Sequence, residues 1–188
     1  MRKRLMDAAI EVIAAKGLAG CQVRDVVRRA RASIGTFYLY FEDKRDIFLK
    51  ILEENNDLLR QTLETRVAEA RGLDDLGQAL RVIYGGYFDF VDAHPKLFLC
   101  FFRSGAYVER GFGEIVERMM MDAAADTRRR LQIGIDAGFV RRDLDVDVLG
   151  HAISGMLVEV AHRYVLRRVS REAALDTLVA FSLDGLRR

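Results

Sequence analysis

Apolar side chains recur at intervals of three and four residues along most of the chain, the spacing that gives a helix one buried face. This spacing predicts helices over residues 23–30, 34–40, 44–70, 75–94, 95–103, 114–137, 147–168 and 171–187. Residues that start or stop helices lie between these segments: Asp43, Asp74 or Asp75, and Ser170 as starts, Gly72 and Gly138 as stops. We therefore expect an all-α protein of about nine helices.

Residues 23–44 pack two short helices and a tight turn into one segment. The apolar positions share one face of the first of these helices: Val23, Val26, Val27 and Ala30. Ser33 is a good N-cap for the second, which is expected to span residues 34–40. Gly35 costs that helix about 1 kcal/mol relative to Ala. We therefore expect another body to approach the backbone at Gly35.

Two short helices joined by a turn form the pattern of a helix-turn-helix, whose second helix lies in the major groove of DNA. Ile34 and Thr36 are suited to contact a thymine methyl group or a base edge. Tyr38 and Tyr40 carry hydroxyls that suit phosphate oxygens. Lys44 would add a cation at the N-terminus of the next helix. The segment therefore predicts a DNA-reading head.

The distribution of charge agrees with this interpretation. Residues 1–50 hold eleven Lys or Arg against six Asp or Glu, a net charge of +5, whereas residues 51–188 carry a net charge of −3. The overall charge of +2 conceals this asymmetry. A basic head on an acidic body is typical of a protein that neutralises DNA phosphates and loses affinity as salt rises.

The chain from about Leu5 to Ile51 resembles the N-terminal domain of the TetR family of bacterial one-component transcriptional repressors. The matching residues are the end of a first helix at Lys16-Gly17, the entry Val23-Arg24-Asp25-Val26, Ala30, Ser33, Gly35-Thr36-Phe37-Tyr38, Tyr40-Phe41 and Lys44. The resemblance implies a DNA-binding domain over residues 1–46, an effector-binding and dimerisation domain over residues 47–188, and a palindromic double-stranded operator. It implies eight DNA contacts: Arg24, Ser33, Ile34, Gly35, Thr36, Tyr38, Tyr40 and Lys44.

The sequence departs from the family pattern in three ways. Cys21-Gln22 replace the usual Thr cap of the second helix, and Ile34 stands where Lys or a small polar residue is common. Arg31 replaces the usual turn glycine. We expect Arg31 to adopt a positive φ at some strain, and to place another cation near the DNA.

Apolar stripes mark the two C-terminal helices. They comprise Leu149, Ile153, Met156, Leu157, Val160 and Tyr164 in the first, and Leu175, Leu178, Val179, Ser182 and Leu186 in the second. In the family, two such helices pair with their copies as a four-helix bundle, and a twofold dimer sets the half-site spacing. The expected dimer contacts are Met156, Val160, Tyr164, Leu175, Leu178 and Ser182. Packing within one chain is the competing explanation for each stripe, and for the helix at residues 147–168 both explanations can hold together.

Bulky, deformable side chains gather in the middle of the chain: Tyr84, Tyr87, Phe88, Phe98, Phe102, Met120 and Met121. Gly85 and Gly86 remove side-chain volume inside the same helix. Together they predict a cavity for a small, largely apolar effector, and ordinary core packing is the alternative for each residue. An effector that prefers a different separation of the two recognition helices would release the DNA.

Composition and missing motifs narrow the class further. The sequence has neither a run of 18 apolar residues nor a hydrophobic signal core, so neither a membrane span nor secretion is expected. Cys21 and Cys100 fall in different predicted domains, which argues against a structural disulfide and favours a cytoplasmic location. No catalytic motif or metal-ligand set is recognisable, so we expect no enzyme activity, metal or cofactor. A homodimeric, effector-controlled repressor is the prediction; an architectural DNA-binding protein with a filled core is the alternative.

Overall fold

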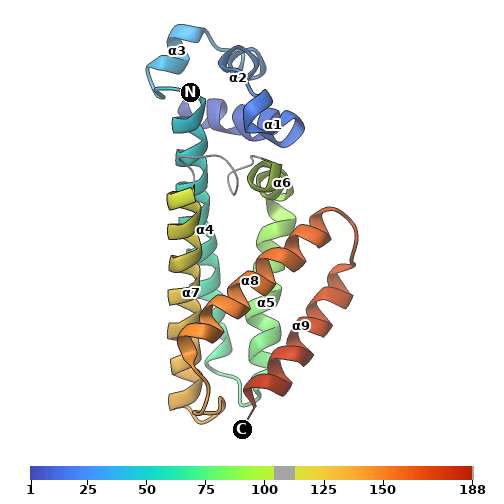
Figure 1. Ribbon diagram of the computed structural model, residues 1–188. Helices are drawn as coiled ribbons and strands as arrows, with labels where there is room; N and C mark the ends of the chain where they lie inside the picture. The colour runs from blue at the N-terminus through green and yellow to red at the C-terminus, as the bar shows by residue number, and fades with distance from the viewer. Residues whose placement is uncertain (104–112, 188) are drawn as a thin grey trace. The chain divides into compact units, whose positions relative to one another are not determined.

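A computed structural model describes residues 1–103 and 113–187, with side chains for 1–102 and 117–187, and the described residues form nine α-helices (Figure 1). The helices are α1 (Arg2–Gly20), α2 (Val23–Ala30), α3 (Ile34–Tyr38), α4 (Lys44–Ala70), α5 (Leu76–Ala93), α6 (Pro95–Arg103), α7 (Gly113–Asp136), α8 (Val146–Val165) and α9 (Arg171–Leu186). The all-α prediction is confirmed. Helices α3 and α8 end earlier than expected, at Tyr38 and Val165.

Capping side chains set where several helices begin. Four predicted caps are confirmed: Ser33, Asp43, Asp75 and Ser170. Each accepts hydrogen bonds from backbone N–H groups at the start of the helix that follows, at distances from 2.7 to 3.2 Å. These N–H groups have no carbonyl partner within their own helix, so the caps fix the helix starts.

The first helix bends where the sequence predicts that it ends. Gly17 has φ 73° and ψ 168°, outside the helical region, and α1 continues beyond it to Gly20. Glycine adopts this conformation without steric penalty because it has no Cβ.

The chain divides into two compact units. The first comprises residues 1–58 together with α6, and the second comprises residues 59–93 together with the chain from residue 114. The predicted boundary after residue 46 differs from this division for two reasons. Helix α4 continues without a break to Ala70, so it contributes to both units, and α6 packs along α1.

The core of the first unit is formed by apolar side chains at helical spacing. The most deeply buried are Leu5, Ile13, Leu18, Val26, Phe37, Phe41, Ile47, Phe48 and Ile51. The Phe37 ring lies 5.6 Å from that of Phe41, centroid to centroid. Helix α3 is therefore anchored by one residue, Phe37, and it ends at Tyr38 so that the chain can return Phe41 to the core.

The core of the second unit contains both C-terminal stripes. Buried residues of α5, α7, α8 and α9 form one cluster, and Met156, Val160, Tyr164 and Leu175 pack against it. Leu178 belongs to the cluster, and the buried Ser182 hydroxyl lies 2.9 Å from that of Tyr84. Packing within one chain therefore occurs at all six residues, and a dimer contact at the partly buried ones stays a prediction.

The glycine pair of α5 does not form the wall of a cavity. A Cβ on Gly86 would lie 2.3 Å from Cγ of Arg66, so the space that Gly86 leaves is filled by the stem of that arginine. The Arg66 guanidinium then pairs with Asp89 at 3.0 Å. At Gly85 an added Cβ would meet no atom within 4 Å. The pair serves helix packing at Gly86, which corrects the interpretation from sequence.

The two cysteines differ from expectation in their placement. Cys21 and Cys100 are both buried free thiols, and both belong to the first unit rather than to separate domains. Burial raises the pKa of each thiol, so neither is a reactive thiolate at neutral pH. In the part of the chain that the structure describes, no helix is both long enough and apolar enough to cross a membrane.

Candidate functional site

The turn between α2 and α3 has the geometry of a helix C-cap. The Ala32 N–H donates to the Val27 carbonyl at 2.9 Å, and the Arg31 N–H donates to the Arg28 carbonyl at 3.3 Å. Arg31 itself has φ 49° and ψ 51°, the left-handed region that glycine usually occupies at this place. The predicted positive φ at Arg31 is confirmed.

Helix α3 turns an apolar and tyrosyl face outward. Ile34 is 54% exposed, Tyr38 57% and Leu39 80%, whereas Phe37 between them is fully buried. Leu39 was not among the predicted contacts, although it lies four residues after Gly35 and so shares its face. A large exposed apolar surface on a short helix indicates that the helix contacts another molecule.

Gly35 is open to the outside. A Cβ at this position would meet only the Ser33 hydroxyl, at 3.8 Å. No atom of the described chain therefore requires a glycine here. The Ser33 hydroxyl is also 2.8 Å from that of Thr36, so these two predicted contacts are held together at the start of α3.

Lys44 is held by backbone carbonyls of the chain itself. Its ammonium donates to the carbonyls of Leu18, Ala19 and Cys21 at 2.9, 3.2 and 3.2 Å. An ammonium has three donors, so these bonds use all of them. Lys44 therefore ties the start of α4 to the end of α1, and a phosphate contact at this position stays a prediction.

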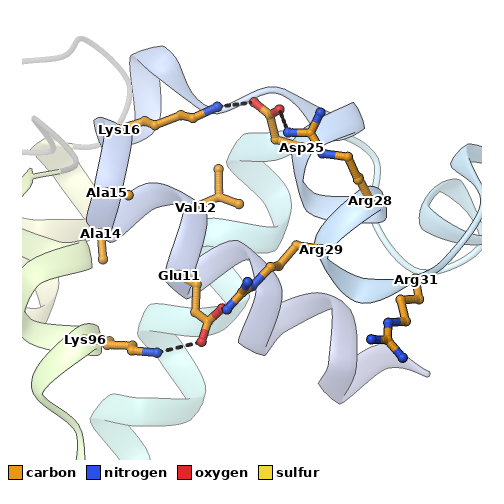
Figure 2. A pocket seen from close by; sticks show the side chains of 10 residues that line it. All are labelled: Glu11, Val12, Ala14, Ala15, Lys16, Asp25, Arg28, Arg29, Arg31 and Lys96. Carbon is orange, nitrogen blue, oxygen red and sulfur yellow. Dashed lines mark hydrogen bonds and ion pairs between the residues drawn. The ribbon is translucent and has the colours of Figure 1, made fainter.

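A groove of the first unit is lined by five cations and two carboxylates (Figure 2). Asp25 pairs with Lys16 at 3.0 Å and with Arg28 at 2.9 Å, and the hydrogen bond from Lys16 is the main cause that lowers the pKa of Asp25. Glu11 pairs with Lys96 at 2.6 Å and with Arg29. The hydrogen bonds from Lys96 and then Arg29 lower the pKa of Glu11.

The cations of this region differ in whether they are paired. Arg31 lies apart from both ion-pair clusters in Figure 2 and has no ion pair among the described residues. Arg24 is exposed and is likewise without a hydrogen-bond or ion-pair partner in the described part of the chain. These two guanidinium groups are available to an anion such as a DNA phosphate.

The second unit contains a partly open cavity of about 410 Å³ whose lining is mostly apolar. Helices α4, α5, α7, α8 and α9 all contribute to its wall. Tyr84 and Tyr87 of the predicted effector set line it. The volume falls within the roughly 300–1,000 Å³ of small-molecule pockets.

The other predicted effector residues lie outside the wall of this cavity. Phe88 is fully buried in the core of the second unit, with its ring edge-on to that of Tyr164. Phe98 and Phe102 belong to α6 in the first unit. Met120 and Met121 lie on α7, where Met121 is exposed. The structure thus brings together two of the seven predicted residues.

Sequence reasoning missed most of the cavity wall. Helix α4 contributes Leu63, Val67 and Ala70, spaced by four and three residues, and α7 contributes Thr127, Arg130, Leu131 and Gly134. These positions have the same helical spacing as any buried helix face. The sequence could therefore show that they point inward, but not that a cavity lies between the helices.

Comparison with known proteins places the chain among transcriptional regulators. Residues 5–51 match the model of a family described as bacterial regulatory proteins, tetR family. The HTH-type transcriptional regulator YdgC of Bacillus subtilis is 24% identical over 178 residues, which cover 93% of this chain and 86% of that protein.

Solved structures share the whole fold. The fatty acid degradation regulator FadR from Bacillus halodurans superposes with a TM-score of 0.81 at 21% identity, and the match covers 100% of both chains. FadR from Bacillus subtilis, in complex with stearoyl-CoA, superposes with a TM-score of 0.77 at 21% identity, covering 96% of this chain and 98% of that one.

Proposed function

Because this chain belongs to the TetR family of transcriptional regulators, we propose that it is a homodimeric repressor released from its operator by a small, largely apolar effector. The observation that carries the proposal is the combination of two features in one chain. The first unit turns the exposed face of α3 outward after a helix-turn-helix bend, and the second unit contains an apolar cavity. A candidate DNA-binding surface and a candidate ligand site thus occur in one chain.

Helix α4 supplies the connection between the two activities. Its first part, from Lys44, belongs to the first unit, and the residues that line the cavity, Leu63, Val67 and Ala70, belong to the second. A ligand that repacks the second part of a continuous helix also moves the first. The effector would thereby change the separation of the two recognition helices, which DNA requires at about 34–36 Å.

A relative of the same fold supports an apolar effector. The FadR of Bacillus subtilis was solved in complex with stearoyl-CoA, a ligand with a long acyl chain. The cavity of this chain is likewise lined mainly by apolar side chains. The alternative function, an architectural protein with a filled core, predicts a second unit without such a cavity.

We assign the DNA contacts to the outward side of the helix-turn-helix. Ile34, Gly35 and Thr36 would meet base edges, and Tyr38 and Tyr40 would donate to phosphates. The exposed Leu39 joins this surface as an apolar contact. Arg24 and Arg31, which have no ion-pair partner among the residues described, would add phosphate contacts.

The dimer is proposed to form through the outward faces of α8 and α9. Phe181 is 70% exposed and Val148 is 63% exposed, and the small residues Ala152 and Ala180 are also exposed. At Gly155 an added Cβ would meet nothing within 4 Å, so this side of α8 is open. These residues add to the six contacts predicted from sequence, of which Leu178 and Ser182 are buried within the chain and Met156, Val160, Tyr164 and Leu175 are partly buried.

The DNA-reading function is tested by fluorescence anisotropy with the DNA that flanks the protein's own gene. Tyr38→Ala is expected to abolish tight binding because the variant loses a phosphate contact and part of the exposed α3 face. Arg24→Gln should lower the slope of log affinity against log salt by about 1. Arg118→Gln, an exposed arginine of α7, is the control and should leave both quantities unchanged.

The effector half of the proposal uses the same assay. Compounds with an apolar body are added to the preformed complex, and release of the DNA is read as a fall in anisotropy. Equal, weak binding of wild type and Tyr38→Ala to any duplex would contradict the DNA-reading proposal. A broad screen in which no compound alters the DNA affinity would contradict effector control.

A further inference from the structure

The apolar cavity of the second unit has one partly buried cation in its wall. Apart from the two tyrosines, four lining side chains are polar or charged: Arg71, Asp75, Thr127 and Arg130. Arg71 and Asp75 are exposed, and Asp75 caps α5. The Thr127 hydroxyl donates to the Ala123 carbonyl at 2.9 Å. Arg130 is partly buried and, within the described part of the chain, makes no hydrogen bond or ion pair.

The two carboxylates that act electrostatically on Arg130 lie close to other arginines. Asp126 pairs with Arg60 at 3.1 Å and with Arg129 at 2.8 Å. Glu64 lies 3.8 Å from Arg129. No carboxylate of the described residues is therefore within ion-pair distance of the Arg130 guanidinium.

The apolar wall removes part of the hydration of the Arg130 guanidinium. Burial lowers the pKa of Arg130 from its usual value, and Asp126 offsets this only in part. A guanidinium nevertheless stays protonated at physiological pH, so Arg130 remains a cation beside the apolar lining. A carboxylate in the cavity would give this partly buried cation an ion-pair partner that the described residues do not supply.

We infer that the effector is an amphiphilic acid, whose apolar body fills the cavity and whose carboxylate pairs with Arg130. This inference rests on the proposed effector function and specifies the class of ligand. The apolar lining selects the body of the ligand, and the fork of the guanidinium matches the two oxygens of a carboxylate. An uncharged molecule of equal size would leave Arg130 unpaired.

The test compares decanoate with decan-1-ol, which share an alkyl chain and differ in the head group. Isothermal titration calorimetry on the full chain should show that decanoate binds about tenfold more tightly or better, the usual effect of a charge-assisted hydrogen bond. Arg130→Gln should remove this preference: decanoate binding weakens about tenfold and decan-1-ol binding changes less than about twofold. Arg130→Lys should restore part of the preference because it keeps the charge.

Arg118→Gln is the matched control, because it removes the same charge from an exposed position of the same helix. It should leave the affinities of both compounds unchanged. Retained binding of decan-1-ol by Arg130→Gln also shows that the variant keeps a folded cavity.

Three results would overturn the inference. They are equal affinity of the wild type for the two compounds, an equal loss of both in Arg130→Gln, and no binding of decanoate below its micellar concentration. Each leaves effector control itself standing, because that proposal is judged by DNA release with compounds of any charge.

Discussion

At the scale of single residues, the most telling feature is an arginine in a glycine conformation. Arg31 has φ 49°, and Arg167, which follows α8, has φ 55°. A side chain in this region costs roughly 1 kcal/mol or more because its Cβ crowds the backbone. Arg31 faces outward beside the recognition helix without an ion pair among the described residues. The strain is consistent with a functional need for a cation at the turn.

Replacing Arg31 by glycine separates stability from DNA binding. Arg31→Gly should raise the free energy of unfolding by about 0.5–1 kcal/mol, because glycine accepts the positive φ without steric cost. The same variant should bind the operator more weakly and with a salt slope smaller by about 1. Urea denaturation and anisotropy measure the two effects.

Arg167→Gly is the control for this prediction, since Arg167 has the same backbone conformation in the second unit. It should stabilise the protein to a similar degree and leave DNA binding unchanged. Operator affinity that is the same for Arg31→Gly and wild type would show that Arg31 does not contact DNA.

At the scale of elements, the sequence predicted what is local and missed what is distant. Helix starts depend on a cap and the following turn, so Ser33 and Ser170 could be identified from their neighbours. Lys44 was read as a free cation because nothing near it in sequence shows that its partners lie 23 to 26 residues earlier. Gly86 was read as a cavity wall because the stem of Arg66 comes from another helix.

The cavity shows the same limit. Tyr84 and Phe88, one turn apart on the same face of α5, both belong to the core cluster, but of the two only Tyr84 lines the cavity. Both positions have the same spacing and the same apolar character, and only the packing of five helices distinguishes them. The sequence near Arg130 gives no sign of its role, because the role depends on the absence of an ion-pair partner among the described residues.

The crossing of α7 and α8 depends on a glycine. A Cβ on Gly150 would lie 2.6 Å from the Ala124 carbonyl oxygen, a backbone atom that cannot turn away. Gly150→Ala should therefore destabilise the protein by about 1–3 kcal/mol through overpacking. Chemical denaturation measures this loss.

Gly85→Ala is the counterpart on α5, where an added Cβ would meet nothing within 4 Å. It should stabilise the protein by about 0.5–1 kcal/mol, the gain in helix propensity from Gly to Ala. Equal effects of the two substitutions would contradict the close contact between α7 and α8.

At the scale of the whole molecule, one chain carries one recognition helix, and a palindromic operator needs two. A twofold dimer places two such helices at a fixed spacing. The apolar stripes of α8 and α9 pack largely within the chain, and in the proposed dimer a partner copy would meet their outward faces. Phe181 is the largest exposed apolar group of α9 and Val148 the most exposed on α8.

Phe181→Glu should therefore convert the dimer to monomers. An unpaired carboxylate in a dry interface costs about 3 kcal/mol or more, which weakens association about 100-fold or more. Sedimentation equilibrium at several protein concentrations measures this change, and operator affinity should fall with it because each monomer reaches only one half-site. Met121→Glu places the same charge on an exposed apolar residue of α7 and should leave the dimer intact. If Phe181→Glu remains dimeric while Met121→Glu dissociates, the pairing surface lies on α7 instead of on α8 and α9.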